Sequence, residues 1–249
     1  MRFPSAMAVA LLIAAVTSPI AGAESHSGTP SVWTILAKSN AAVVKQKTVA
    51  IVGTSTANVV THRPNNVTVS WVDTGKFSGM GSTDTSGRSE FTESLSTVSD
   101  GVTKSLTFEY DTVHNEIASH VSGGKGWKCG NAGVVLNSID VWTPVQIGVI
   151  TKAVAVKSKA KVVLAGSTTY HGSTVWTVRV SSHAWSAKTK ITSVDTGTYY
   201  VDRSTYLLDG QAGTESEKGP TGIVRLNNAA TFSNYGSALN PQMHGCPTK

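Results

Sequence analysis

Charged residues and cysteines are scarce in this chain of 249 residues, and each scarcity excludes a class of protein. Because only 14% of the residues are charged, no disordered acidic or basic tail can dominate the chain. Two cysteines are too few for a disulfide-dense scaffold, and the 23 glycines follow no collagen period. The Ala, Glu, Lys and Leu heptads of a coiled coil are also missing. The sequence is therefore that of a globular chain.

Leucine is scarce as well. The 11 leucines are outnumbered by 31 valines and 31 threonines, and 30 further residues are serine. β-Branched side chains fit pleated strands and lose rotamer freedom in helices. The composition therefore predicts a mainly β chain.

The first 23 residues have the features of a secretory signal peptide. Arg2 gives a positive start, residues 6–16 form an apolar run, and Ala21-Gly22-Ala23 is a small-x-small cleavage site. The run is shorter than the roughly 20 residues that span a bilayer, which favours a cleaved signal over a membrane anchor. No cysteine follows the run as a lipid-attachment site. We expect residues 24–249 to form one exported domain, secreted or in the periplasm or cell envelope, without a lipid anchor.

Cys129 and Cys246 are the only cysteines, and more than a hundred residues separate them. In an oxidising compartment such a pair is most simply one disulfide. A zinc site would need more Cys, His or carboxylate ligands at short spacing than His244-Gly245-Cys246 supplies. Two free thiols are the remaining alternative. We expect a disulfide that links the C-terminus to the middle of the chain.

The formal net charge is +6, and it is unevenly distributed. Residues 84–116 are mainly acidic. A basic surface outside the cytoplasm can bind an anionic membrane surface or a wall polymer, or it can be an ordinary solvated face. Nucleic acid is not an expected partner, since clustered arginines are missing. The stretch between Asp140 and Asp195 contains no acidic residue but seven cations: Lys152, Lys157, Lys159, Lys161, Arg179, Lys188 and Lys190.

The pattern along the chain predicts two helices within a long series of strands. Thr29-Pro30-Ser31 begins a helix over residues 31–46, with apolar residues at helical spacing. Thr143-Pro144 begins a second helix over residues 143–156. Alternation of apolar and polar residues predicts strands both before and after this central helix. Gly123-Gly124-Lys125-Gly126, Tyr170-His171-Gly172 and Leu208-Asp209-Gly210 are expected turns, and residues 211–220 an exposed hairpin loop.

Four segments of the chain follow the pattern of one known family. Residues 31–39 are similar to a first helix, and residues 172–180 to the strand after a central helix. Residues 199–208, which include Asp202 and Thr205, resemble an Asp, turn, Thr hairpin, and Phe232 to Gly236 followed by Pro241 resembles a closing strand. Together they resemble the bacterial lipoprotein-carrier family typified by LolA, with its mycobacterial LppX/LprG-like lipid carriers. The resemblance covers most of residues 30–241.

The resemblance implies an α+β, mainly β fold in which a curved antiparallel sheet forms an incomplete barrel. An N-terminal helix and a central lid helix would cover a concave face that holds acyl chains. Lipid-binding residues on the lid would then be Val145, Ile147, Ile150 and Val154, which can equally be ordinary core residues packed on the sheet. The six tryptophans are scattered, and each is expected in the core. The expected partner is a lipid or an acylated protein, bound by a monomer.

No common catalytic motif occurs in the sequence. The nucleophile elbow, the phosphate loop and the His-Glu-x-x-His metal motif are all missing. His114 and His120 lie near Asp111 and Glu116, but alternation along a strand predicts that they are exposed. We therefore expect no catalytic residues, cofactor or metal. The alternatives to a carrier are an envelope sensor or interaction module of the same fold, a secreted hydrolase, and a wall-binding β-protein.

Overall fold

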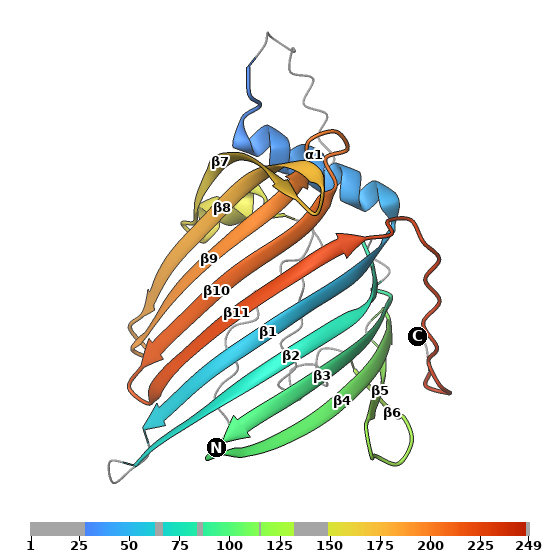
Figure 1. Ribbon diagram of the computed structural model, residues 1–249, viewed down its shortest axis with the longest axis vertical. Coiled ribbons are helices and arrows are strands. Elements are labelled where there is room, and N and C mark those ends of the chain that lie inside the picture. Colours follow the sequence, from blue (N-terminus) through green and yellow to red (C-terminus); the bar gives the residue numbers. More distant parts are fainter. Residues whose placement is uncertain (1–27, 63–66, 84–86, 115, 132–148, 248–249) are drawn as a thin grey trace.

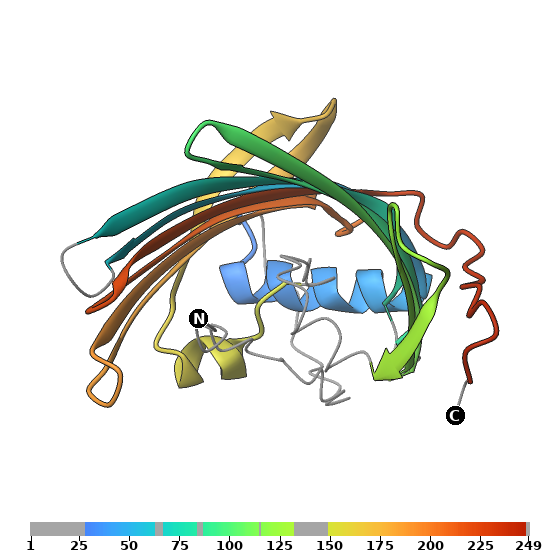
Figure 2. The ribbon, with the colours of Figure 1, turned by 90° about the horizontal axis from the view of Figure 1, so that it is seen from below.

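The computed structural model describes residues 28–62, 67–83, 87–114, 116–131 and 149–247. Within this part of the chain, all strands belong to one 11-stranded antiparallel sheet (Figure 1). Its order is β6-β5-β4-β3-β2-β1-β11-β10-β9-β8-β7, and β6 does not pair with β7. The sheet is strongly curved and open, so the predicted incomplete barrel is confirmed (Figure 2).

The first six strands precede the central segment and the other five follow it. The first series is β1 (Thr48–His62), β2 (Thr68–Ser82), β3 (Ser89–Ser99), β4 (Val102–Val113), β5 (Glu116–Val121) and β6 (Lys128–Asn131). The second series is β7 (Lys161–Tyr170), β8 (Ser173–Ser186), β9 (Ile191–Asp202), β10 (Leu208–Gly219) and β11 (Gly222–Ser233). Each series is a meander of hairpins, and the pairing of β1 with β11 joins the two series in the middle of the sheet.

Tight turns set the register of the hairpins. Asp100-Gly101 joins β3 to β4 with positive φ at both residues, 51° and 76°. His171-Gly172 joins β7 to β8 in the same way, with φ of 47° and 87°. This conformation matches the right-handed twist of the flanking strands. At the turn before β10, the Asp202 carboxylate accepts hydrogen bonds from the backbone N–H groups of Ser204 at 2.9 Å and Thr205 at 2.7 Å.

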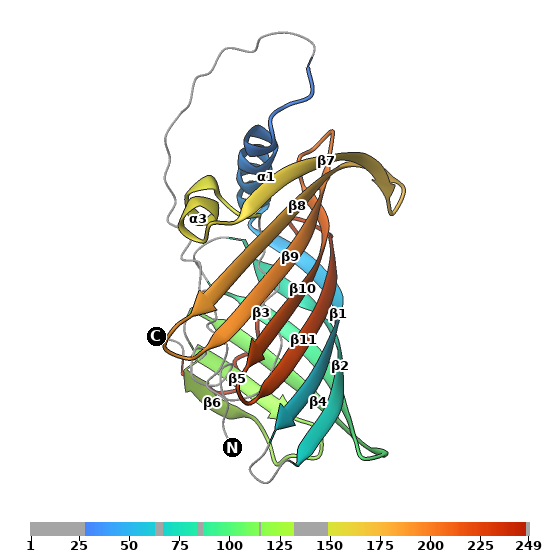
Figure 3. The same ribbon diagram turned by 90° about the vertical axis from the view of Figure 1, so that its left-hand side faces the viewer.

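The predicted N-terminal helix is α1 (Val32–Gln46), and it lies in the hollow of the curved sheet (Figure 2). Ser31 is its N-cap, and the Ser31 hydroxyl accepts a hydrogen bond from the Thr34 N–H at 3.1 Å. Such a cap satisfies one of the free donors of the first turn. Figure 3 shows α1 and the short helix α3 (Lys152–Lys157) on the same side of the sheet.

The central helix differs from the prediction. Residues 143–148 lie outside the described residues, and residues 149–151 are not helical, so that α3 begins at Lys152 with Thr151 as its N-cap. The reason is a competing partner for the backbone of Val149. The Asn40 side chain of α1 accepts from the Val149 N–H at 3.0 Å and donates to the Val149 carbonyl at 3.0 Å. These bonds tie the segment to α1 in a non-helical conformation.

The main core lies between α1 and the sheet. It combines buried residues of the helix with residues from both strand series: Ile35, Leu36, Val43, Val49, Ile51, Phe77, Val149, Trp176, Val178, Val201, Leu208, Ala230 and Phe232. A smaller cluster of Ala57, Val59 and Leu226 lies further along β1 and β11. The core therefore occupies the α1 end of the concave face.

Two sequence predictions in the C-terminal half are wrong. Residues 211–219 form most of strand β10 rather than an exposed loop, and residues 208–210 begin that strand rather than form a turn. The segment contains three Gly, two Glu, one Asp and one Lys, which are residue types of low β propensity. It is a strand because β9 and β11 both pair with it and satisfy its backbone. The turn at residues 122–127, between β5 and β6, agrees with the prediction.

Candidate functional site

Strand alternation gives the sheet two chemically different faces. In β1, Ile51 is fully buried and faces α1, whereas Val52 is 58% exposed on the outer, convex face. Directly paired residues of antiparallel strands share a face. The register therefore assigns every strand residue to the concave or the convex face.

At the α1 end, the concave face is filled by the main core. Ile150, one of the four predicted lipid-binding residues, is partly buried against this core. Val154 lies half-buried on α3, where Ala155 is the buried residue. Val145 and Ile147 lie outside the described residues. In the described part of this segment, Ile150 packs as part of the core, and Val154 is only partly covered.

Away from α1, the concave face carries a second set of apolar side chains, which we call the distal concave patch. Leu95 pairs with Leu106 in register, and Leu106 is 47% exposed. The patch consists of Ala57, Val59, Trp71, Leu95, Leu106 and Leu226. Exposed apolar area on a concave surface is unfavourable in water and available to an apolar ligand. The sequence signal that could have found it is the alternation of Leu106 and Phe108 with polar residues in β4.

The concave face becomes acidic across β9 and β10. Glu215 pairs directly with Leu226 on one side and with Asp195 on the other, so both carboxylates share the concave face. Glu217 lies two residues further along the same face. The Ser182 and Ser193 hydroxyls donate to Asp195 at 2.8 and 3.1 Å. Burial, followed by repulsion from Asp195 and Glu217, raises the pKa of Glu215 to about 7.

The raised pKa of Glu215 predicts a pH-dependent stability. Its pKa of about 7 in the folded protein lies above the ordinary 4.5, so the stabilisation present below pH 4.5 is lost as the pH rises through 7. Glu215→Gln should therefore raise Tm at pH 8 by about 2–4 °C, which corresponds to about 1 kcal/mol after allowance for solvent screening. At pH 4.5 the two proteins should melt together. Differential scanning calorimetry at both values measures the effect.

Glu116→Gln is the matched control for this pH effect. Glu116 pairs with Val113 and Asn131 rather than with a carboxylate. Its replacement should change Tm by less than about 2 °C at either pH, as for an ordinary surface substitution. If Glu215→Gln changed Tm by the same amount at pH 4.5 and at pH 8, the raised pKa of Glu215 would be contradicted.

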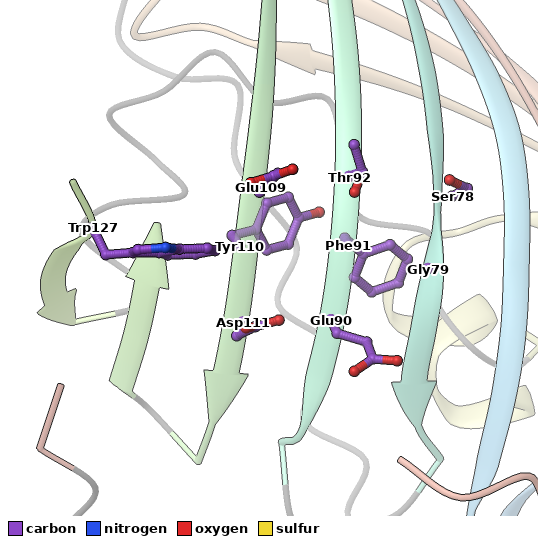
Figure 4. A pocket seen from close by; sticks show the side chains of 9 residues that line it. All are labelled: Ser78, Gly79, Glu90, Phe91, Thr92, Glu109, Tyr110, Asp111 and Trp127. Atoms are coloured by element: carbon purple, nitrogen blue, oxygen red, sulfur yellow. The ribbon is translucent and has the colours of Figure 1, made fainter. Parts of the chain in front are cut away.

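The convex face carries a groove of about 370 Å³ across β2, β3 and β4 (Figure 4). Ser78, Thr92 and Glu109 belong to the register row of the exposed Val52 and so lie on the convex face. Glu90 pairs with Asp111 two residues further along the same strands, so this pair also lies on the convex face. Trp127 closes the groove on the β5 side. The groove thus has a polar and acidic lining together with three aromatic residues, Phe91, Tyr110 and Trp127.

The C-terminal segment is fastened beside this groove. Cys246 and Cys129 are joined by a disulfide with an Sγ–Sγ distance of 2.06 Å. His244 stacks on Trp127 with ring centroids 3.6 Å apart, and its Nε2 lies 3.2 Å from the Asp111 carboxylate. Burial raises the pKa of Asp111, although His244 opposes this. The disulfide therefore stabilises a segment that also covers Asp111.

The histidine cluster expected from the sequence is divided between different contacts. His120 Nδ1 lies 3.4 Å from Glu109, whereas Asp111 contacts His244 from the distant C-terminal segment. His114 is exposed at the turn after β4. Among the residues that the structure describes, no group of three or more His, Cys, Asp or Glu side chains is placed to hold a metal ion. In the same residues, no helix is both long and apolar enough to cross a membrane.

Sequence comparison finds no family model and no curated protein that matches this chain. Solved structures do match. The lipoprotein LppX of Mycobacterium tuberculosis is 10% identical, with a TM-score of 0.40 over 84% of this chain and 97% of its own. LprF of Mycobacterium bovis is 15% identical, with a TM-score of 0.44 over 88% of this chain and 100% of its own. A LolA superfamily protein of Nitrosomonas europaea is 8% identical, with a TM-score of 0.24 over 85% of this chain and 96% of its own. These matches include the groups that the sequence resembles.

Proposed function

We propose that this protein is an exported carrier that binds the acyl chains of a lipid or an acylated protein on its concave face. The distal concave patch is the observation that carries the proposal, because Leu106 is 47% exposed in the hollow of the sheet and Trp71 and Leu95 are only partly buried. Its other members, Ala57, Val59 and Leu226, are buried and form the apolar floor of the patch. Sequestering one methylene contributes about 0.8 kcal/mol, so ten methylenes contribute several kcal/mol after ordering costs. Binding and release need no catalytic residue.

The remaining features fit an extracytoplasmic protein. Residues 1–23 would be removed as a signal peptide, and residues 24–249 would form a single monomeric domain without a lipid anchor. The Cys129–Cys246 disulfide supports an oxidising compartment, since such bonds persist outside the cytoplasm.

The direct experiment is a titration of the mature protein with a fluorescent fatty-acyl probe, with and without an unlabelled long-chain competitor. Saturable binding that the competitor reverses supports the carrier. A folded protein that binds neither the probe nor the competitor contradicts it.

The segment that ends in α3 is proposed as the lid over the bound chains, with the half-buried Val154 as its contact among the described residues. Ile150 packs against the main core, and Val145 and Ile147 lie outside the described residues. Val154→Asp should weaken probe binding about tenfold, because it brings a carboxylate to an apolar contact. Val156 on the same helix is 70% exposed and provides the matched control. The titration of both variants measures the difference. Equal affinities for Val154→Asp and Val156→Asp would reject the lid.

A sensor or interaction module is the second candidate function. The observation that favours it is the filled α1 end of the concave face, where Ile35, Leu36 and Val149 are buried in the core. This function would leave the distal concave patch to contact a protein partner. In the probe titration such a module would show no saturable binding of acyl chains.

A further inference from the structure

The C-terminal half of the sheet separates its charges between its two faces. The carboxylates of Asp195, Glu215 and Glu217 lie on the concave face. Lys218 follows Glu217 in sequence, and Arg225 precedes Leu226, the strand partner of Glu215. Because neighbouring strand residues face opposite sides, Lys218 and Arg225 lie on the convex face. Both cations are exposed. The convex surface of β8 to β11 is therefore basic although acidic residues lie directly behind it.

One region of this convex surface also carries exposed apolar side chains. Trp185 is 63% exposed and Val194 is 42% exposed. The register places Trp185 beside Thr192 and then Lys218, and Val194 beside Ser216 and then Arg225. The exposed residues Lys188 and Lys190 lie in the turn that follows Trp185. We call the six residues the basic convex patch: Trp185, Lys188, Lys190, Val194, Lys218 and Arg225.

The positive charge of the patch is not neutralised within the protein. Among the described residues, no ion pair within 4 Å is formed by Lys188, Lys190, Lys218 or Arg225. The carboxylates nearest in sequence, Glu217 and Asp195, point to the opposite face. The four cations therefore present their full charge to solvent.

The patch lies at one end of the molecule, opposite α1. The turns of the β8–β9 and β10–β11 hairpins are neighbours along this end of the sheet (Figure 1). Successive strands are about 4.8 Å apart, so the patch spans four adjacent strands over about 15 Å. This is a continuous surface that a flat partner can contact.

We propose that the basic convex patch docks this protein onto an anionic lipid bilayer. Lysine and arginine complement the negative surface of such a membrane. An exposed tryptophan between lysines fits the bilayer interface, where an amphipathic ring and a cation are both favoured. A polyanion alone would explain the cations but not the exposed Trp185 and Val194. The docking does not depend on acyl-chain binding by the concave face, because the two surfaces are on opposite sides of the sheet.

The test is co-sedimentation of the mature protein with vesicles of 30% phosphatidylglycerol and 70% phosphatidylcholine, and with vesicles of phosphatidylcholine alone. The proposal predicts strong binding to the anionic vesicles only, with most of it lost in 0.5 M salt. Lys188→Gln with Lys190→Gln should reduce the partition constant about 25-fold, at about fivefold per charge. Trp185→Ala should reduce it about tenfold.

Lys152→Gln with Lys157→Gln is the matched control, because it removes the same charge from α3 on the other side of the sheet. It should lower the partition constant less than twofold. Circular dichroism confirms that each variant is folded. Equal losses for the two double variants, or equal binding to both vesicles, would overturn the proposal. Binding to heparin or duplex DNA without binding to the anionic vesicles would overturn it as well.

Discussion

Replacing both cysteines by serine is expected to lower the free energy of unfolding by about 4 kcal/mol. The disulfide joins Cys129 of the edge strand β6 to Cys246 across 117 residues, and such a long loop costs much entropy to close without the bond. The bond also holds His244 against Trp127 and Asp111. Urea denaturation of the double variant and the oxidised parent at pH 7 measures the loss.

Reduction provides the matched control for the cysteine variant. The parent protein in dithiothreitol should unfold at the same urea concentration as the double variant, because both lack only the bond. The single variants Cys129→Ser and Cys246→Ser should be equally destabilised, and the double variant no more than either, since the two residues act as a unit. A loss below about 1 kcal/mol would show that the C-terminal segment is held without the disulfide.

Leu106→Asp is expected to weaken binding of an acyl probe at least 30-fold, because an ionised carboxylate among apolar contacts costs 2 kcal/mol or more. Leu106 is 47% exposed in the free protein, so the substitution should leave folding nearly unchanged. The same titration as for the parent protein measures the affinity. Its fluorescence change is read against that of the free probe in buffer.

Val98→Asp is the matched control for Leu106→Asp. Val98 is 42% exposed on β3, but it pairs with Val72 and Thr103 in a convex row of the register. The two variants thus place the same charge at similar exposure on opposite faces. Unchanged affinity for Leu106→Asp, or an equal loss for Val98→Asp, would contradict binding on the concave face.

The mainly β class and the N-terminal helix could be predicted from local signals, whereas the curved, incomplete barrel was implied by the family resemblance. Valine and threonine content predicted a mainly β chain, and the Thr29-Pro30-Ser31 cap predicted α1 to within a residue. The isolated cysteine pair lies at disulfide distance. Each of these signals depends on residues next to one another in sequence or on simple composition.

The remaining features depend on partners far apart in sequence. Strand β10 has the composition of a loop, and it is a strand because β9 and β11 pair with it on both sides. Residues 149–151 are not helical although a helix was predicted there, because Asn40 of α1 binds the backbone of Val149. Trp185 was expected in the core, yet it is 63% exposed. Only the register shows that Lys218 and Glu217, neighbours in sequence, occupy opposite faces.

The central claim is that the concave face carries acyl chains. Native mass spectrometry of the protein purified without detergent, followed by organic extraction, tests it most directly. The account predicts a bound mass that disappears on extraction and is recovered as a lipid or fatty acid. A bare polypeptide mass with an empty extract, from protein that also fails to bind added acyl chains, would contradict the account.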